Sequence, residues 1–89
     1  MKTSIRFRSE VFLEGDQYVA ICPDLDVSSF GQTPIEARDS LTEALEAFVE
    51  ECESMGTLQD VLREAGFSLS KSGWIPRRPI STGMVSIRG

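Results

Sequence analysis

A strong helix start lies near the middle of the chain, at Thr33-Pro34-Ile35-Glu36. The Thr33 hydroxyl can accept a hydrogen bond from a free main-chain N–H group of the first turn. Glu36, three residues later, completes a capping box, and Pro34 has a φ that already suits a helix. The sequence therefore predicts a long helix from this point to about Met55.

The predicted helix has an apolar stripe and an acidic row on opposite faces. The apolar residues recur at steps of three and four, which places them on one side of a helix: Ala37, Leu41, Ala44, Leu45, Phe48, Val49, Cys52 and Met55. The acidic row consists of Glu36, Asp39, Glu43, Glu46, Glu50 and Glu53. Arg38 is the only base in this helix, so the row lacks the oppositely charged neighbours that usually support a solvated face. The row is therefore either an ordinary solvated face or a surface for a basic partner.

The length of 89 residues predicts one domain, residues 1–89, with a thin core. Self-association as a dimer or tetramer is expected, because a chain this small buries only about 60–65% of its unfolded surface. No apolar run approaches the roughly 18 residues that a membrane helix needs. Cys22 and Cys52 fall in predicted core positions without a signal peptide, which favours reduced thiols and a cytoplasmic location over a disulfide.

The net charge of −5 is unevenly distributed along the chain. Residues 1–64 hold five Lys/Arg and fourteen Asp/Glu, whereas residues 65–89 hold four Lys/Arg and no acid. The acidic body argues against nucleic acid as the main ligand. The basic tail can neutralise part of that body, in the same chain or in a neighbour, and Arg77-Arg78 offers only weak attraction for phosphate.

The first third of the chain predicts three antiparallel strands. Residues 5–14 alternate between apolar and polar side chains, Gly15-Asp16 supplies a turn, and residues 18–22 are apolar on both faces. Pro23 ends the second strand, and residues 27–30 form a short third one. The expected fold class is α+β: a three-stranded antiparallel meander with the long amphipathic helix packed on it, then a short second helix and a C-terminal strand, in the order β-β-β-α-α-β.

The second half of the chain divides at residue 67. Gly56 is expected to end the long helix, Thr57 to cap a short helix over residues 58–65, and Gly66 to stop it. Residues 67–79 read as a loop or irregular strand, and residues 80–87 as a last strand. The crossover rule places a last strand parallel to the first if both lie in one chain. Pairing within the chain and exchange with a neighbouring subunit both remain open. Residues 1–67 thus form the core and residues 68–89 a basic C-terminal loop and strand.

The chain contains no histidine, so His-based nucleophile pairs and most zinc sites are excluded. A magnesium-dependent nuclease needs several acids that converge from different elements. Glu10 on the first strand and Glu43 or Glu46 on the helix offer two such acids, but the last strand offers none because no acid follows Glu64. We therefore predict no enzymatic activity, no catalytic residue, no cofactor and no metal. Asp24 and Asp26, after the second strand, are either turn formers, which is the favoured interpretation, or acids that bind a metal or a partner.

Two segments together resemble the HicB family of bacterial antitoxins. The first is Tyr18-Val19-Ala20-Ile21-Cys22-Pro23-Asp24-Leu25-Asp26-Val27, and the second is Gly31-Gln32-Thr33-Pro34-Ile35-Glu36-Ala37 followed by the acidic helix. The resemblance covers about residues 5–67, and its motifs are specific only in combination. It implies a partial ribonuclease H-like fold without nuclease activity.

The resemblance also implies a partner, the HicA toxin, a small basic protein of the double-stranded-RNA-binding fold that cleaves mRNA. The acidic row and the pair Asp24 and Asp26 are the candidate contact residues. Many family members add a C-terminal DNA-binding domain, whereas this chain has only a loop and a short strand there, so direct DNA binding is not expected. The alternative is an orphan HicB-like domain that self-associates, has no toxin partner and binds an unknown ligand.

Overall fold

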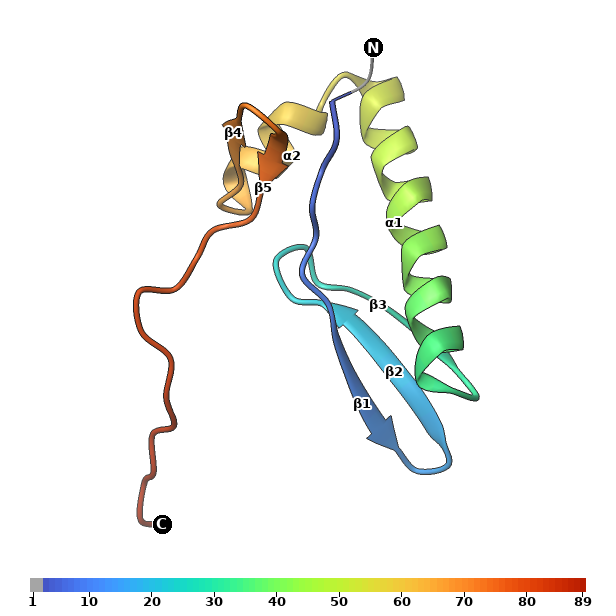
Figure 1. Cartoon of the computed structure of the whole chain (residues 1–89), viewed down its shortest axis with the longest axis vertical. Helices are drawn as coiled ribbons and strands as arrows, with labels where there is room; N and C mark the ends of the chain where they lie inside the picture. The colour runs from blue at the N-terminus through green and yellow to red at the C-terminus, as the bar shows by residue number, and fades with distance from the viewer. Residues whose placement is uncertain (1–2) are drawn as a thin grey trace.

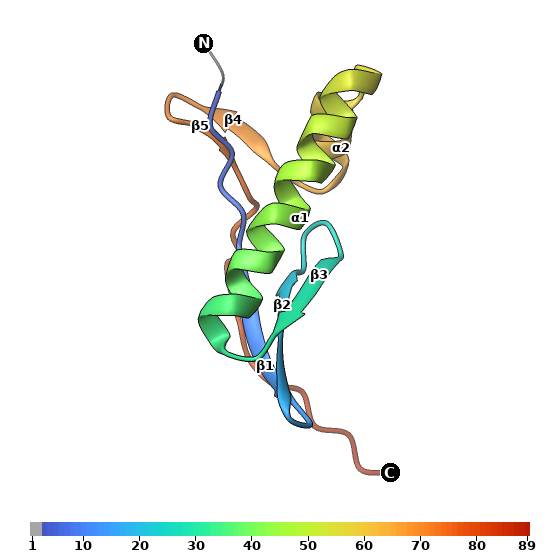
Figure 2. The same cartoon turned by 90° about the vertical axis from the view of Figure 1, so that its right-hand side faces the viewer.

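The computed structural model describes residues 3–89 and has three antiparallel strands followed by two helices and a small hairpin. The elements are β1 (Glu10–Glu14), β2 (Gln17–Cys22), β3 (Val27–Gly31), α1 (Pro34–Met55), α2 (Leu58–Glu64), β4 (Ser68–Ser70) and β5 (Gly73–Ile75). The sheet order is β1-β2-β3, and α1 lies across one face of it (Figures 1 and 2). The predicted α+β fold with a meander and a long helix is confirmed. None of the helices in residues 3–89 is long and apolar enough to cross a membrane.

Both ends of α1 lie where the sequence predicts, but only half of the capping box forms, because Glu36 bonds to the N–H of Gln32 and not to that of Thr33. The main-chain N–H of Glu36 donates to the Thr33 hydroxyl at 3.1 Å, and the Glu36 carboxylate accepts from the N–H of Gln32 at 3.0 Å. Gly56 ends the helix in the left-handed conformation, with φ of 71°. The cap of α2 differs from the prediction. Thr57 makes no side-chain capping bond, and its hydroxyl donates instead to the Cys52 carbonyl at 3.4 Å.

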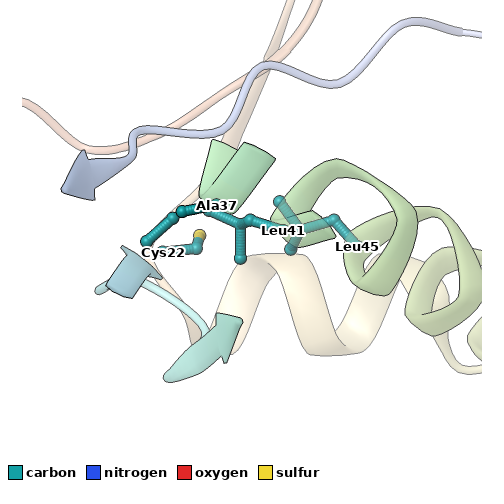
Figure 3. Packing of buried hydrophobic residues seen from close by; sticks show 5 residues of the cluster. Cys22, Ala37, Leu41 and Leu45 are labelled. Atoms are coloured by element: carbon teal, nitrogen blue, oxygen red, sulfur yellow. The ribbon is translucent and has the colours of Figure 1, made fainter. Parts of the chain in front are cut away.

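The main core lies between α1 and the strands. It consists of Ala20, Cys22, Ala37, Leu41 and Leu45, of which Ala20, Cys22 and Ala37 are fully buried; Figure 3 shows how four of them meet. The predicted apolar stripe is correct except at Met55, whose side chain is 67% exposed because α1 extends beyond the sheet. Both cysteines are free and buried, as expected for reduced thiols.

The first strand is shorter than predicted, because β1 starts at Glu10 and not near Ile5. Glu10 is paired with Ile21, and β2 ends one residue later, before Pro23, so the residues before Glu10 have almost no strand left to pair with. Residues 3–9, here called the N-terminal segment, are extended and form one parallel bridge, between Ile5 and Trp74.

The expected last strand lies at different residues. Residues 67–79, predicted as a loop or irregular strand, contain the β4–β5 hairpin, and Trp74 of β5 is buried with Leu62 and Phe67 in a second core cluster. β5 pairs with β4 in a separate two-stranded sheet and contacts the N-terminal segment through one isolated parallel bridge, so within residues 3–89 no strand after α1 joins the three-stranded sheet. Residues 80–87, predicted as the strand, form none. Because Pro76 and Pro79 each lack an N–H and lie next to β5, the ladder does not continue into the tail.

Residues 79–89, here called the C-terminal tail, extend away from the rest of the molecule (Figure 1). Ile80, Met84, Val85 and Ile87 are between 88% and 104% exposed. The radius of gyration is 15.1 Å, compared with about 12 Å for a compact domain of this length. A single copy of the chain therefore leaves an apolar segment in solvent.

Candidate interaction surface

All six residues of the acidic row are exposed, as the helical spacing predicts. Within residues 3–89, the only ion pairs involve Asp24, so no carboxylate of the row has a salt-bridge partner there. Glu36 has a local role as well, because it accepts the capping hydrogen bond from Gln32. The other five residues of the row present their carboxylates along the length of α1.

The acidic row borders two different hollows of the surface. Glu46, Glu50 and Glu53 lie on a groove of about 870 Å³ between α1 and the N-terminal segment, here called the helix groove. Its apolar lining includes Ile5, Phe7, Leu45, Val49 and Trp74.

The other half of the row, toward the N-terminal end of α1, borders a second hollow. Glu36, Asp39 and Glu43 line a shallower hollow of about 370 Å³, together with Gln17 and Phe30. The row therefore provides two acidic surfaces, one beside an apolar groove and one beside the end of β3.

Asp24 is a structural residue and not a free surface acid. Its side chain is only 1% exposed and accepts two hydrogen bonds from Arg8, at 2.6 Å to Nη2 and 3.1 Å to Nε. Arg77 Nε lies 3.8 Å from the same carboxylate. Such a two-point arginine–carboxylate pair fixes the relative position of the groups that carry it. Asp24 therefore ties the loop after β2 to the N-terminal segment and to the start of the basic tail.

Asp26 lies in the same loop and is exposed, with a left-handed φ of 56°. This conformation suits an aspartate in a turn. Of the two loop acids, only Asp26 remains at the surface as a candidate partner-binding residue. Arg77, one of the four basic residues of positions 65–89, neutralises part of the acidic body within one chain through its ion pair with Asp24.

The groups around Asp24 also affect two ionisable side chains. The hydrogen bond from Arg8 to Asp24 raises the pKa of the Arg8 guanidinium, which stays charged at any accessible pH. Burial raises the pKa of the Cys22 thiol. A protonated, buried thiol is a poor nucleophile, so Cys22 serves as a core residue.

The outer face of the sheet carries an apolar row with one side chain from each strand. Phe12 is paired with Val19, and Val19 is paired with Phe30, so the three side chains lie side by side across the strands. Phe12 is 47% exposed and Phe30 is 65% exposed. The alternation of residues 5–14 placed Phe12 among charged neighbours, and only the register shows that it joins an apolar row.

The three acids considered for a nuclease site lie on only two elements, Glu10 on β1 and both Glu43 and Glu46 on α1. Within residues 3–89, no three His, Cys, Asp or Glu side chains form a group that could hold a metal ion. The absence of enzymatic activity stays a prediction, which a magnesium-dependent ribonuclease assay on the purified protein tests. Comparisons with protein-family models, curated proteins and solved structures gave no match. The similarity to HicB proteins therefore rests on the motifs of the sequence.

Proposed function

We propose that this chain is a cytoplasmic antitoxin that binds a small basic, mRNA-cleaving toxin similar to HicA and covers its active site. The observation that carries the proposal is the acidic row of α1, whose exposed carboxylates have no ion-pair partner within residues 3–89. An RNA-cleaving protein must attract phosphates with basic side chains. Carboxylates presented on one rigid helix attract the same basic side chains and so compete with RNA.

Charge also favours rapid encounter between the two proteins. Electrostatic steering raises association rates by about 10- to 1,000-fold, and it weakens as salt screens the charges. The row concentrates six acids on one side of a 22-residue helix, whereas the chain as a whole carries a net charge of −5. The first contact with a basic protein is therefore expected along α1.

Co-expression tests the proposal most directly. The adjacent reading frame should encode a short basic protein with a catalytic histidine, whose expression alone stops growth. Co-expression with this chain should restore growth and yield a stable complex of the two proteins. The proposal fails if the neighbouring product is harmless, or if it remains toxic beside soluble, folded antitoxin.

Charge-neutralising variants locate the contact surface. Glu43→Gln, Glu46→Gln and Glu50→Gln together should slow association about tenfold at low salt and much less at high salt. The matched control is Glu10→Gln, Glu14→Gln and Asp16→Asn, which removes the same charge from exposed positions of the β1–β2 hairpin. Stopped-flow measurement of the association rate of each variant with the toxin shows whether the acidic row of α1 forms the contact surface. Equal rates for the two variants would place the interface away from α1.

The second candidate is an orphan self-associating domain without a toxin. The exposed apolar row Phe12–Val19–Phe30 and the solvated apolar tail favour self-association, because a small domain gains stability by covering such surfaces. The absence of a basic neighbouring frame would favour this candidate over the antitoxin.

A further inference from the structure

We propose that the C-terminal tail of a second copy of this chain fills the helix groove, so that two copies exchange tails in a symmetric dimer. The inference does not depend on a toxin. It rests on three features of residues 3–89: an apolar groove with a free strand edge, a solvated apolar tail that fits it, and a connection that directs each tail away from its own groove.

The groove offers both an apolar lining and free main-chain groups. The N-terminal segment pairs with β5 on one edge only, through Arg6 N–H to the Trp74 carbonyl at 3.0 Å and Trp74 N–H to the Ser4 carbonyl at 2.9 Å. Successive residues of an extended segment direct their main-chain groups to opposite edges. The main-chain N–H and C=O groups of Ile5 and Phe7 therefore point away from β5. Within the described residues, these groups make no main-chain hydrogen bond. An added strand can pair with this edge, as in β-augmentation.

The tail has the composition of a strand covered on both sides. In extended conformation Val85 and Ile87 lie on one face, whereas Ile80 and Met84 lie on the other. All four side chains are almost fully solvated in the single chain. A strand that lies between α1 and the rest of a core needs apolar side chains on both faces. The tail meets this requirement. A strand added to the outer edge of a sheet with one solvated face would need apolar side chains on one face only.

The charges of the tail and the groove are complementary. The tail and the residue before it carry Arg88 and Arg78 and no acid. The groove is lined by three acids, Glu46, Glu50 and Glu53, and by one base, Arg38, so its charged residues are mainly acidic. A tail in the groove therefore places arginines near carboxylates that have no ion-pair partner within residues 3–89.

The tail of the same copy leaves on the wrong side of the molecule. In Figure 1 the N-terminal segment lies between α1 and the departing tail. Arg77 is held at this position by Asp24 at 3.8 Å, and its side chain lies against Gly66, where an added Cβ would be 2.9 Å from Arg77 Cδ. Pro76 and Pro79 restrict the backbone on either side of Arg77. The tail is thus directed outward, where it can reach a neighbour, and reciprocal exchange fills both grooves of a two-fold dimer.

Sedimentation of the 89-residue chain over a range of concentrations tests this proposal without any partner. The wild type should form a dimer. Val85→Glu with Ile87→Glu should raise the dissociation constant at least about 100-fold, because two apolar side chains can no longer enter the groove. Thr42→Trp, at an exposed position that lines the groove, should block the site and have a similar effect. The control Ala47→Glu with Ser54→Glu adds the same charge at exposed positions of α1 that do not line the groove and should change the constant less than about fivefold.

Mixing the two blocked chains tests exchange itself. The Val85→Glu, Ile87→Glu chain keeps an open groove, and the Thr42→Trp chain keeps an intact tail. Together they should form a heterodimer that is weaker than the wild-type dimer and stronger than either variant alone. Circular dichroism confirms that each variant is folded. A monomeric wild type, a dimer indifferent to both changes, or a mixture that does not associate would each overturn the proposal, and the second result would indicate the Phe12–Val19–Phe30 row as the interface.

Discussion

Trp74→Ala is the single substitution that most directly tests how the N-terminal segment and the hairpin are held together. The Trp74 side chain is 6% exposed and packs with Leu62 and Phe67, while its main chain forms the only parallel bridge of the described residues. Arg63 adds a cation–π contact, with its guanidinium carbon 5.5 Å from the ring centroid. Removing this side chain therefore takes away the largest buried side chain of one of the two core clusters.

The expected cost follows from burial. Truncating a buried tryptophan to alanine costs about 3–5 kcal/mol, and a chain of this length is stable by about 4–13 kcal/mol. The variant should thus lose a large part of its free energy of unfolding. At about 4–8 °C per kcal/mol for a domain of this size, its melting temperature should fall by at least about 12 °C.

Urea unfolding followed by circular dichroism measures this loss, because the variant lacks the only tryptophan of the chain. The matched control is Leu69→Ala, the cross-strand partner of Trp74 in the same hairpin, whose side chain is 60% exposed. It should cost about 1 kcal/mol or less. If Trp74→Ala costs no more than Leu69→Ala, Trp74 does not anchor the second core cluster and the placement of β5 is wrong.

The remaining predictions concern the helix start and the core thiol, and urea unfolding measures each of them. Thr33→Ala should cost about 1 kcal/mol by removing the capping oxygen, and full stability in this variant would contradict the cap. Gly31→Ala should cost about 1–3 kcal/mol, because its Cβ would lie 2.6 Å from the main-chain nitrogen of Ala37 and cannot be accommodated without backbone movement. The pKa of Cys22 is raised above its ordinary 9.0, so its contribution to stability is fully present below pH 9 and is lost as the pH rises through the raised pKa. Cys22→Ala should show less loss of stability at alkaline pH than the wild type.

The elements that the sequence predicted well are those set by neighbouring residues. The Thr33 N-cap, the left-handed Gly56 and the turn at Gly15 each depend on a few consecutive positions, and all three are present. The last strand depends on a distant contact, the burial of Trp74 against Leu62 and Phe67. The local sequence pattern predicted the last strand at residues 80–87 instead, because such a pattern does not reveal which apolar residues are buried in the fold.

The role of Asp24 could have been found from the strand register. A short turn at residues 15–16 pairs Glu10 with Ile21, and extending that register by two residues brings Arg8 opposite Pro23. Asp24 is the next residue, and the structure shows it paired with Arg8. The contribution of Arg77 could not have been found in this way, since the loop geometry that brings it to Asp24 has no local signal.

The division of the acidic row decides how the two proposals fit together. Glu46, Glu50 and Glu53 border the helix groove, whereas Glu36, Asp39 and Glu43 border the hollow beside β3. A tail in the groove would occupy the first group and leave the second free. A basic partner bound to the dimer would then contact α1 near its N-terminal end. In that case Asp39→Asn with Glu43→Gln should slow association of the dimer more than Glu50→Gln with Glu53→Gln, although each pair removes the same charge.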